Sequence, residues 1–168
     1  MTEEIQRNYL QINSIQDLNE VIKPSEDYSL NLLEPTNFQL NKFFYKNIGK
    51  NHKWVDRLVW TETQWIDYVS NKNVKTYIFK NKEDLVGFFE LMFHLEKQEV
   101  EIAYFGLLEE FQNKKLGSHL LTEAIKRSFE YNMCLLNRIT CRILHFCNNH
   151  KQTSFDKQTL NLEICELL

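Results

Sequence analysis

The sequence predicts a mixed α/β (α+β) fold with a central, mostly antiparallel sheet flanked by helices. Two observations lead to this prediction. Apolar residues alternate with a period of two through much of residues 74–108, which is typical of consecutive strands. Two segments before this region and one after it repeat apolar residues at helical spacing. A chain of 168 residues can bury one ordinary core, so we expect a single domain over residues 1–168.

The N-terminal third predicts two short strands and a helix. Residues 9–12 and 28–33 alternate in polarity, and the first of these is the weaker strand candidate. After Pro35, apolar residues recur at helical spacing, and Gly49 is expected to end that helix. The apolar positions are Leu40, Phe43, Phe44 and Ile48.

A second helix and a run of three strands are predicted next. Thr61 stands three residues before Gln64, which is a capping-box pattern, and an apolar face follows it. Residues 74–79 and 85–93 then alternate on either side of a turn-like segment at 81–84, as in a hairpin. Residues 99–108 predict a third strand, after a polar break, so the three strands form an antiparallel meander.

The remaining third contains the clearest helical pattern in the chain. Apolar residues between Leu116 and Phe129 recur at helical spacing, and Ile139, Cys141 and Ile143 then alternate as in a strand. Residues 160–164 predict a last short strand.

Composition argues against several classes of protein. A formal charge of −3 without a basic stripe offers no electrostatic footprint for nucleic acid. No apolar run approaches the length of a membrane span, and the acidic start is unlike a secretory signal, so we expect a cytoplasmic protein. The four cysteines lack zinc or disulfide spacing, and the histidines do not recur at metal-ligand spacing, so we expect no metal.

The junction between residues 99 and 129 offers an anion site. It combines a strand, a tight loop with a glycine, and a long helix whose first turn has free backbone N–H groups. Gln112, Asn113, Lys114 and Lys115 add polar and cationic donors to that loop. A diphosphate held by backbone amides and by lysine is therefore one hypothesis, although many such junctions bind nothing.

The residue pattern of this junction resembles the acetyl-coenzyme A motif of the GNAT superfamily of N-acetyltransferases, written Q/R-x-x-G-x-G/A. Gln112 matches the first position and Gly117 the last, whereas Lys115 occupies the place of the middle glycine. The resemblance implies a GNAT-like fold and acetyl-CoA as cosubstrate. It implies that Leu107 and Leu108 offer main-chain groups to the pantetheine arm. The pyrophosphate would lie against Gln112, Asn113, Lys114, Lys115, Leu116, Gly117 and Ser118.

The same resemblance implies transfer of acetyl to a primary amine by direct attack in a ternary complex. Glu101 stands where several family members have a catalytic base, with Glu90 and Glu99 as competitors and a solvated strand glutamate as the plain alternative. The tyrosine acid of many members is not matched, because Phe155 occupies its place. Residues 134–168 thus diverge from the family pattern. A catalytically weak or inactive CoA-binding or interaction module with the same fold is the alternative.

The acceptor is a small-molecule or protein amine that the sequence does not identify. Residues 54–60 lie where GNAT proteins often build the acceptor pocket, and Trp54, Trp60 and Asp56 suit a cationic amine. The plainer interpretation is core packing with Asp56 and Arg57 as a surface pair. The aromatic-rich composition leaves room for a homodimer.

Overall fold

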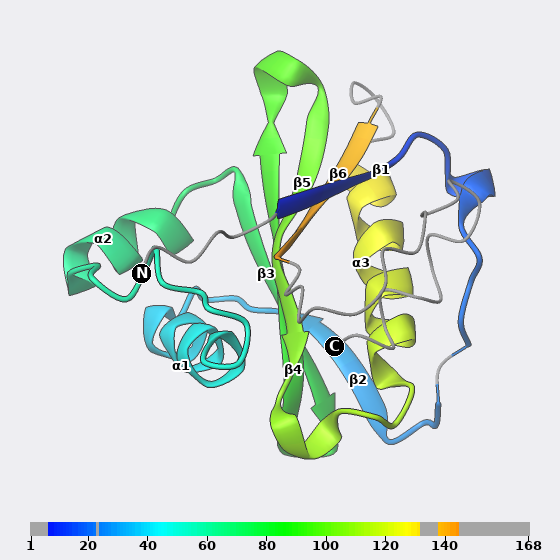
Figure 1. Ribbon diagram of the computed structural model, residues 1–168, viewed down its shortest axis with the longest axis horizontal. Coiled ribbons are helices and arrows are strands. Elements are labelled where there is room, and N and C mark those ends of the chain that lie inside the picture. Colours follow the sequence, from blue (N-terminus) through cyan, green and yellow to red (C-terminus); the bar gives the residue numbers. More distant parts are fainter. Residues whose placement is uncertain (1–6, 23, 132–137, 145–168) are drawn as a thin grey trace, which may run out of the picture.

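The computed structural model describes residues 7–22, 24–131 and 138–144, which form three layers (Figure 1). A six-stranded sheet lies between α1 and α2 on one face and α3 on the other. The elements in chain order are β1 (Arg7–Ile12), η1 (Ile15–Asp17), β2 (Tyr28–Leu32), α1 (Phe38–Gly49), α2 (Glu62–Val69), β3 (Val74–Asn81), β4 (Asp84–His94), η2 (Leu95–Lys97), β5 (Glu99–Leu107), η3 (Glu109–Phe111), α3 (Leu116–Tyr131) and β6 (Arg138–Leu144).

The strands are ordered β1-β6-β5-β4-β3-β2 across the sheet. Each neighbouring pair is antiparallel except β5 and β6, which run parallel. The predicted mixed, mostly antiparallel sheet and its β3-β4-β5 meander are therefore confirmed. The weakly predicted first strand also forms, and it pairs with β6 at the edge of the sheet.

Local signals in the sequence explain where α1 and α2 begin. The Asn37 side chain caps α1 by accepting a hydrogen bond from the Leu40 amide. Thr61 and Gln64 form the predicted capping box of α2. Helix α1 ends at Gly49, as predicted, although Gly49 is its last helical residue and has no positive φ. A Cβ at Gly49 would lie 2.6 Å from the Cβ of Trp54, so the glycine permits close packing of that tryptophan.

Two apolar clusters hold the layers together. The cluster that contains the α3 side chains covers one face of the sheet, and the other cluster joins the opposite face to α1, α2 and the loop between them. The first contains Phe79, Phe89, Leu91, Ile102 and Leu120 among others. The second consists of Phe44, Tyr45, Ile48, Trp54, Trp65, Ile78, Phe88 and Leu108.

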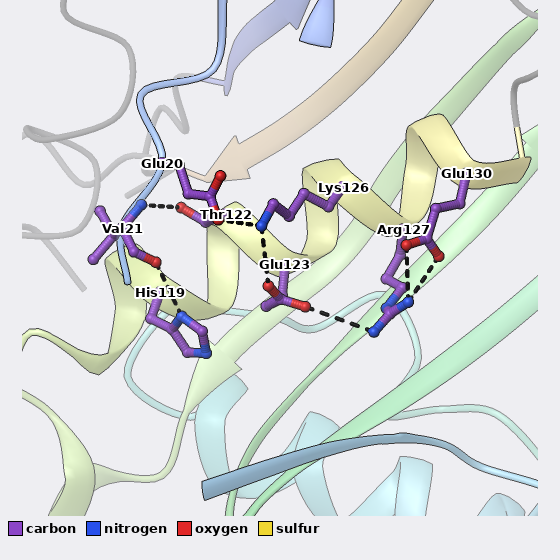
Figure 2. Close-up of polar contacts among 8 residues, drawn as sticks. All are labelled: Glu20, Val21, His119, Thr122, Glu123, Lys126, Arg127 and Glu130. Carbon is purple, nitrogen blue, oxygen red and sulfur yellow. Dashed lines mark hydrogen bonds and ion pairs between the residues drawn. The ribbon is translucent and has the colours of Figure 1, made fainter. Parts of the chain in front are cut away.

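The segment before β2 is fastened to the outer side of α3 (Figure 2). The Val21 amide donates to the Thr122 hydroxyl over 3.2 Å, and the Val21 carbonyl accepts from His119 Nδ1 over 3.1 Å. Lys126 pairs with Glu20 in the same segment. His119 and Thr122 are both buried, and their hydrogen bonds to Val21 give these polar side chains partners inside the protein.

None of the helices in the described part of the chain combines the length and apolar character of a membrane span. Several features of the sequence lie outside the described residues, namely the strand predicted at 160–164, Phe155, Cys134, Cys147 and Cys165.

Candidate functional site

The parallel pairing of β5 with β6 is short, so among the described residues no strand pairs with the rest of β5 on that side. We call this part of β5 its open edge. The two strands pair only from Glu99 with Arg138 to Ile102 with Cys141. Beyond this point β5 continues to Leu107, whereas β6 continues to Leu144 beside β1. Main-chain groups of β5 beyond Ile102 are thus available on the side from which β6 has departed.

A bulge in β5 lies at the start of this open edge. Glu90 pairs with Tyr104 and Leu91 with Ile102, so Ala103 is an extra residue. Side chains at positions 101 and 104, three residues apart, therefore point to the same face of the sheet, as do their partners Met92 and Glu90. That face carries α1 and α2.

The two predicted pantetheine contacts differ in how their main-chain groups are used. The Leu108 amide donates to the Val86 carbonyl over 2.9 Å, and the Leu108 carbonyl accepts from the Phe111 amide. Because successive residues of a strand direct their N–H and C=O groups to opposite sides, the groups of Leu107 face the open edge. Gln112 Nε2 donates to the Leu107 carbonyl over 3.2 Å.

The predicted phosphate loop joins η3 to the start of α3. Asn113 and Lys115 have φ values of 59° and 58°, so both adopt the left-handed conformation. None of the hydrogen bonds among the described residues uses the amides of Asn113, Lys114 or Lys115. Consecutive amides in such a loop form a concave anion-binding nest, and the free N–H groups of the first turn of α3 adjoin it. Lys115 thus adopts the conformation that the missing glycine would supply.

Side chains of the loop divide into exposed and packed groups. Asn113, Lys114 and Lys115 are exposed, and the Lys114 ammonium lies 5.2 Å from the centre of the Phe111 ring. Leu116 and Gly117 are buried, and Ser118 is half-buried. Because the Leu116 side chain belongs to the core cluster under α3, only its main chain faces the loop.

Glu101 lies on β5 just before the bulge, and its side chain is paired. The Glu101 carboxylate accepts a hydrogen bond from His94 Nε2 over 2.8 Å, and both side chains are half-buried. The contact between His94 and Glu101 was not predicted from the sequence. The spacing of strands β4 and β5 around their short connection could have indicated it, since His94 and Glu99 pair across the ladder.

Glu90, a competitor for the role of base, belongs to a closed network. Its side chain is 1% exposed and has partners on both carboxylate oxygens. Asn41 donates to Oε1 over 2.8 Å, while Arg57 and Tyr68 donate to Oε2 over 2.9 Å and 3.0 Å. With both oxygens occupied inside the core, Glu90 has a structural role.

The predicted surface pair of Asp56 and Arg57 is wrong. Arg57 is 5% exposed and forms a buried ion pair with Glu90. Its guanidinium carbon lies 3.8 Å from the ring centre of Tyr68 and 4.0 Å from that of Tyr104. Burial is the largest influence and lowers the pKa of Arg57, but Glu90, Tyr68 and Tyr104 together raise the pKa by more, so it is raised overall. Arg57 thus stays charged within an aromatic cage.

Asp56 is exposed on the loop between α1 and α2, where two tyrosines orient its carboxylate. Tyr45 donates to Oδ1 over 2.7 Å and Tyr104 donates to Oδ2 over 2.6 Å. Burial raises the pKa of Asp56, but the hydrogen bonds from Tyr104 and Tyr45 lower it by more. The carboxylate is therefore ionised at neutral pH. Trp54 packs in the core as the plainer interpretation held, with its ring centre 4.8 Å from that of Tyr104.

The described residues provide an open strand edge, a loop at its end in which the amides of Asn113, Lys114 and Lys115 make no hydrogen bond, and ionisable side chains beside its start. The Acetyltransferase (GNAT) family model matches residues 35–149 of the chain. No relative among curated proteins matches it.

Solved structures of acetyltransferases share the fold at low sequence identity. An aminoglycoside acetyltransferase from an uncultured soil metagenomic sample, in complex with trehalose, has 7% identity and a TM-score of 0.59, over 80% of this chain and all of that one. A GCN5-related N-acetyltransferase from Kribbella flavida has 13% identity and a TM-score of 0.58, over 83% of this chain and 49% of that one. With the family model covering more than half of the chain, the protein belongs to the acetyltransferase (GNAT) family.

Proposed function

We propose that the protein transfers acetyl from acetyl-CoA to a primary amine by direct attack in a ternary complex. The observation that carries this proposal is the open edge of β5, which leads directly into the positive-φ loop before α3. The Leu107 amide, which faces the open edge, suits an extended amide-containing arm, whereas the Leu107 carbonyl already accepts from Gln112. The loop amides suit a pyrophosphate. Membership in a family of acetyltransferases supports the same ligand.

The loop residues fit the ligand without a central glycine. Lys115 already has the φ that a glycine would otherwise supply, and its exposed ammonium group adds positive charge beside the amides. Gln112, Asn113, Lys114, Lys115, Leu116, Gly117 and Ser118 form the pyrophosphate site in this proposal. Leu107 contributes more to the arm than Leu108, whose main-chain groups already have partners.

Glu101 is the proposed base. As the amine nitrogen bonds to the acetyl carbon, the carbon–sulfur bond breaks and the amine loses a proton. The Glu101 carboxylate takes up that proton, directly or through water, and the sulfur leaves as a thiol after taking a proton from water. Glu101 suits this role better than Glu90, because Glu101 is half-buried, is bonded to His94 and lies beside the bulge where the open edge starts.

Titration calorimetry with acetyl-CoA and thiol release with an amine panel test the proposal. We expect binding, and thiol release with at least one primary amine. Glu101→Gln should lower kcat/KM by about 10²–10⁴ while the Kd for acetyl-CoA stays unchanged. Glu96→Gln, an exposed substitution in η2, is the matched control.

Three results separate the alternatives. Absence of acetyl-CoA binding contradicts the proposal as a whole. Binding without thiol release for any amine favours a CoA-binding module that lacks turnover. Full activity of Glu101→Gln leaves the transfer reaction in place but removes Glu101 from the role of base.

A further inference from the structure

Within the described part of the chain, the Asp56 carboxylate on the α1-α2 loop has no ion-pair partner, although the charge of the neighbouring Arg57 acts on it. Glu90 and Arg57 form an ion pair in the core and cancel each other's charge. Among the described residues, no lysine or arginine forms an ion pair with Asp56, whose carboxylate accepts hydrogen bonds from the neutral hydroxyl groups of Tyr45 and Tyr104. An added cation would therefore meet a net negative charge of one.

Aromatic rings surround this charge on the side of the core. The ring centre of Tyr104 lies 5.2 Å from that of Tyr45 and 4.8 Å from that of Trp54. The Arg57 guanidinium occupies one face of Tyr104, where Glu90 holds it. Arg57 is thus prevented from turning outward to neutralise Asp56, and the exposed carboxylate remains open to a cation from solvent.

The position of Tyr104 places this carboxylate near the proposed reaction site. Tyr104 follows the bulge at Ala103 and is the second residue beyond the last β5-β6 pair. Glu101 lies three positions earlier on the same face, which corresponds to about 10 Å along a strand. The Glu101 carboxylate and the Asp56 carboxylate bound by Tyr104 therefore both lie on this face of the sheet, near the start of the open edge.

We infer that Asp56, held by Tyr45 and Tyr104, binds a second ammonium group of the acceptor, so that the substrate is a di- or polyamine rather than a monoamine. The inference rests on the proposed function. The reacting nitrogen must be neutral when it attacks, so a carboxylate that is ionised at neutral pH serves a second, non-reacting ammonium group better than the reacting one. Asp56 is then a binding residue that sets specificity, and Glu101 receives the proton of the reacting amine.

Thiol release with matched straight-chain acceptors tests this inference. Diamines of four to ten carbons are compared with monoamines of the same length. For the preferred diamine we expect a KM about tenfold lower than for its monoamine. Asp56→Asn should raise the KM for the diamine by about tenfold, change kcat by less than about twofold and leave the monoamine unaffected. Asp67→Asn, an exposed substitution on α2, removes the same charge and should change none of these values.

The outcomes keep this inference apart from the proposed function. If acetyl-CoA binds and monoamines react, but Asp56→Asn does not raise the KM for diamines, only the present inference is overturned. An equal loss for diamines and monoamines in Asp56→Asn also overturns it. If no amine reacts, tryptophan fluorescence can follow diamine binding, because Trp54 packs against Tyr104. Binding of equal strength in the wild type and in Asp56→Asn overturns the inference, and binding weakened about tenfold supports it.

Discussion

At the scale of single residues, the ion pair between Arg57 and Glu90 organises the side of the molecule that carries the α1-α2 loop. Each charge would be costly in the core without the other, and each has further partners: Asn41 and Tyr68 bind Glu90, and aromatic rings surround Arg57. The Arg57 amide also donates to the Tyr45 hydroxyl, which in turn donates to Asp56. The buried pair therefore fixes the loop on which the exposed carboxylate is carried.

We expect Glu90→Gln to lower the free energy of unfolding by about 3–5 kcal/mol, because it leaves the Arg57 charge buried and unpaired. Urea denaturation monitored by tryptophan fluorescence measures the change. Glu83→Gln, in the exposed turn between β3 and β4, is the control and should change stability by less than about 0.5 kcal/mol. A loss below about 1 kcal/mol for Glu90→Gln contradicts the assignment of a buried pair.

The ionisation of Asp56 predicts a dependence of stability on pH. Its pKa is lowered from the usual 3.8 in the folded state, so the unfolded chain binds the proton more readily. The resulting stabilisation is present above the unfolded pKa and is lost as the pH falls through the folded pKa. Asp56→Asn should therefore cost stability at about pH 7 and less at about pH 3, as measured by thermal unfolding. Tyr104→Phe, which removes one hydrogen bond, should reduce this dependence, and an unchanged profile argues against the contact.

At the scale of elements, the loop before α3 has a lysine, Lys115, at a position of positive φ that glycine adopts more readily. The left-handed conformation costs a non-glycine residue about 1–2 kcal/mol, whereas glycine loses about 0.5–1 kcal/mol through its freedom in the unfolded chain. Lys115→Gly should thus stabilise the protein by about 0.5–1 kcal/mol. Lys114→Gly, where φ is not positive, should destabilise it by a similar amount. Chemical denaturation of both variants checks the opposite signs, and equal signs contradict the described loop conformation.

Elements specified by local signals were predictable from the sequence. The capping box at Thr61, the period of two in β3 to β5 and the helical spacing in α3 each involve residues close in the chain. The burial of Arg57 could not be predicted, because its partner Glu90 is 33 residues away and the adjacent Asp56 suggested a simpler pairing. The bulge at Ala103 was missed as well, since periodicity does not show how two strands are registered. The loop before α3 could be predicted from its sequence motif. The contact between Asp56 and Tyr104 could not, because it joins residues that only the folded chain brings together.

At the scale of the whole molecule, the proposed ligand would join elements that the protein leaves apart. The open edge of β5 is part of the sheet, whereas the loop at residues 113–115 leads into α3. The pantetheine arm and the pyrophosphate of acetyl-CoA would therefore contact different elements. Binding to the folded state alone raises stability by about 2.7 kcal/mol at a ligand concentration of one hundred times Kd.

Thermal unfolding with the whole ligand and with part of it can distinguish the contribution of the β5 edge from that of the loop before α3. For a chain of this size, acetyl-CoA at that concentration should raise Tm by about 5–10 °C. The nucleotide half of CoA, which lacks the arm, should give a smaller rise at the same absolute concentration, because it leaves the edge of β5 unpaired. Lys115→Asp should reduce both rises by placing negative charge beside the phosphate loop, with Lys97→Asp in η2 as the exposed control. Equal rises for the half and the whole ligand would show that the open edge of β5 contributes nothing to binding, and the pantetheine contact at Leu107 would then have to be abandoned.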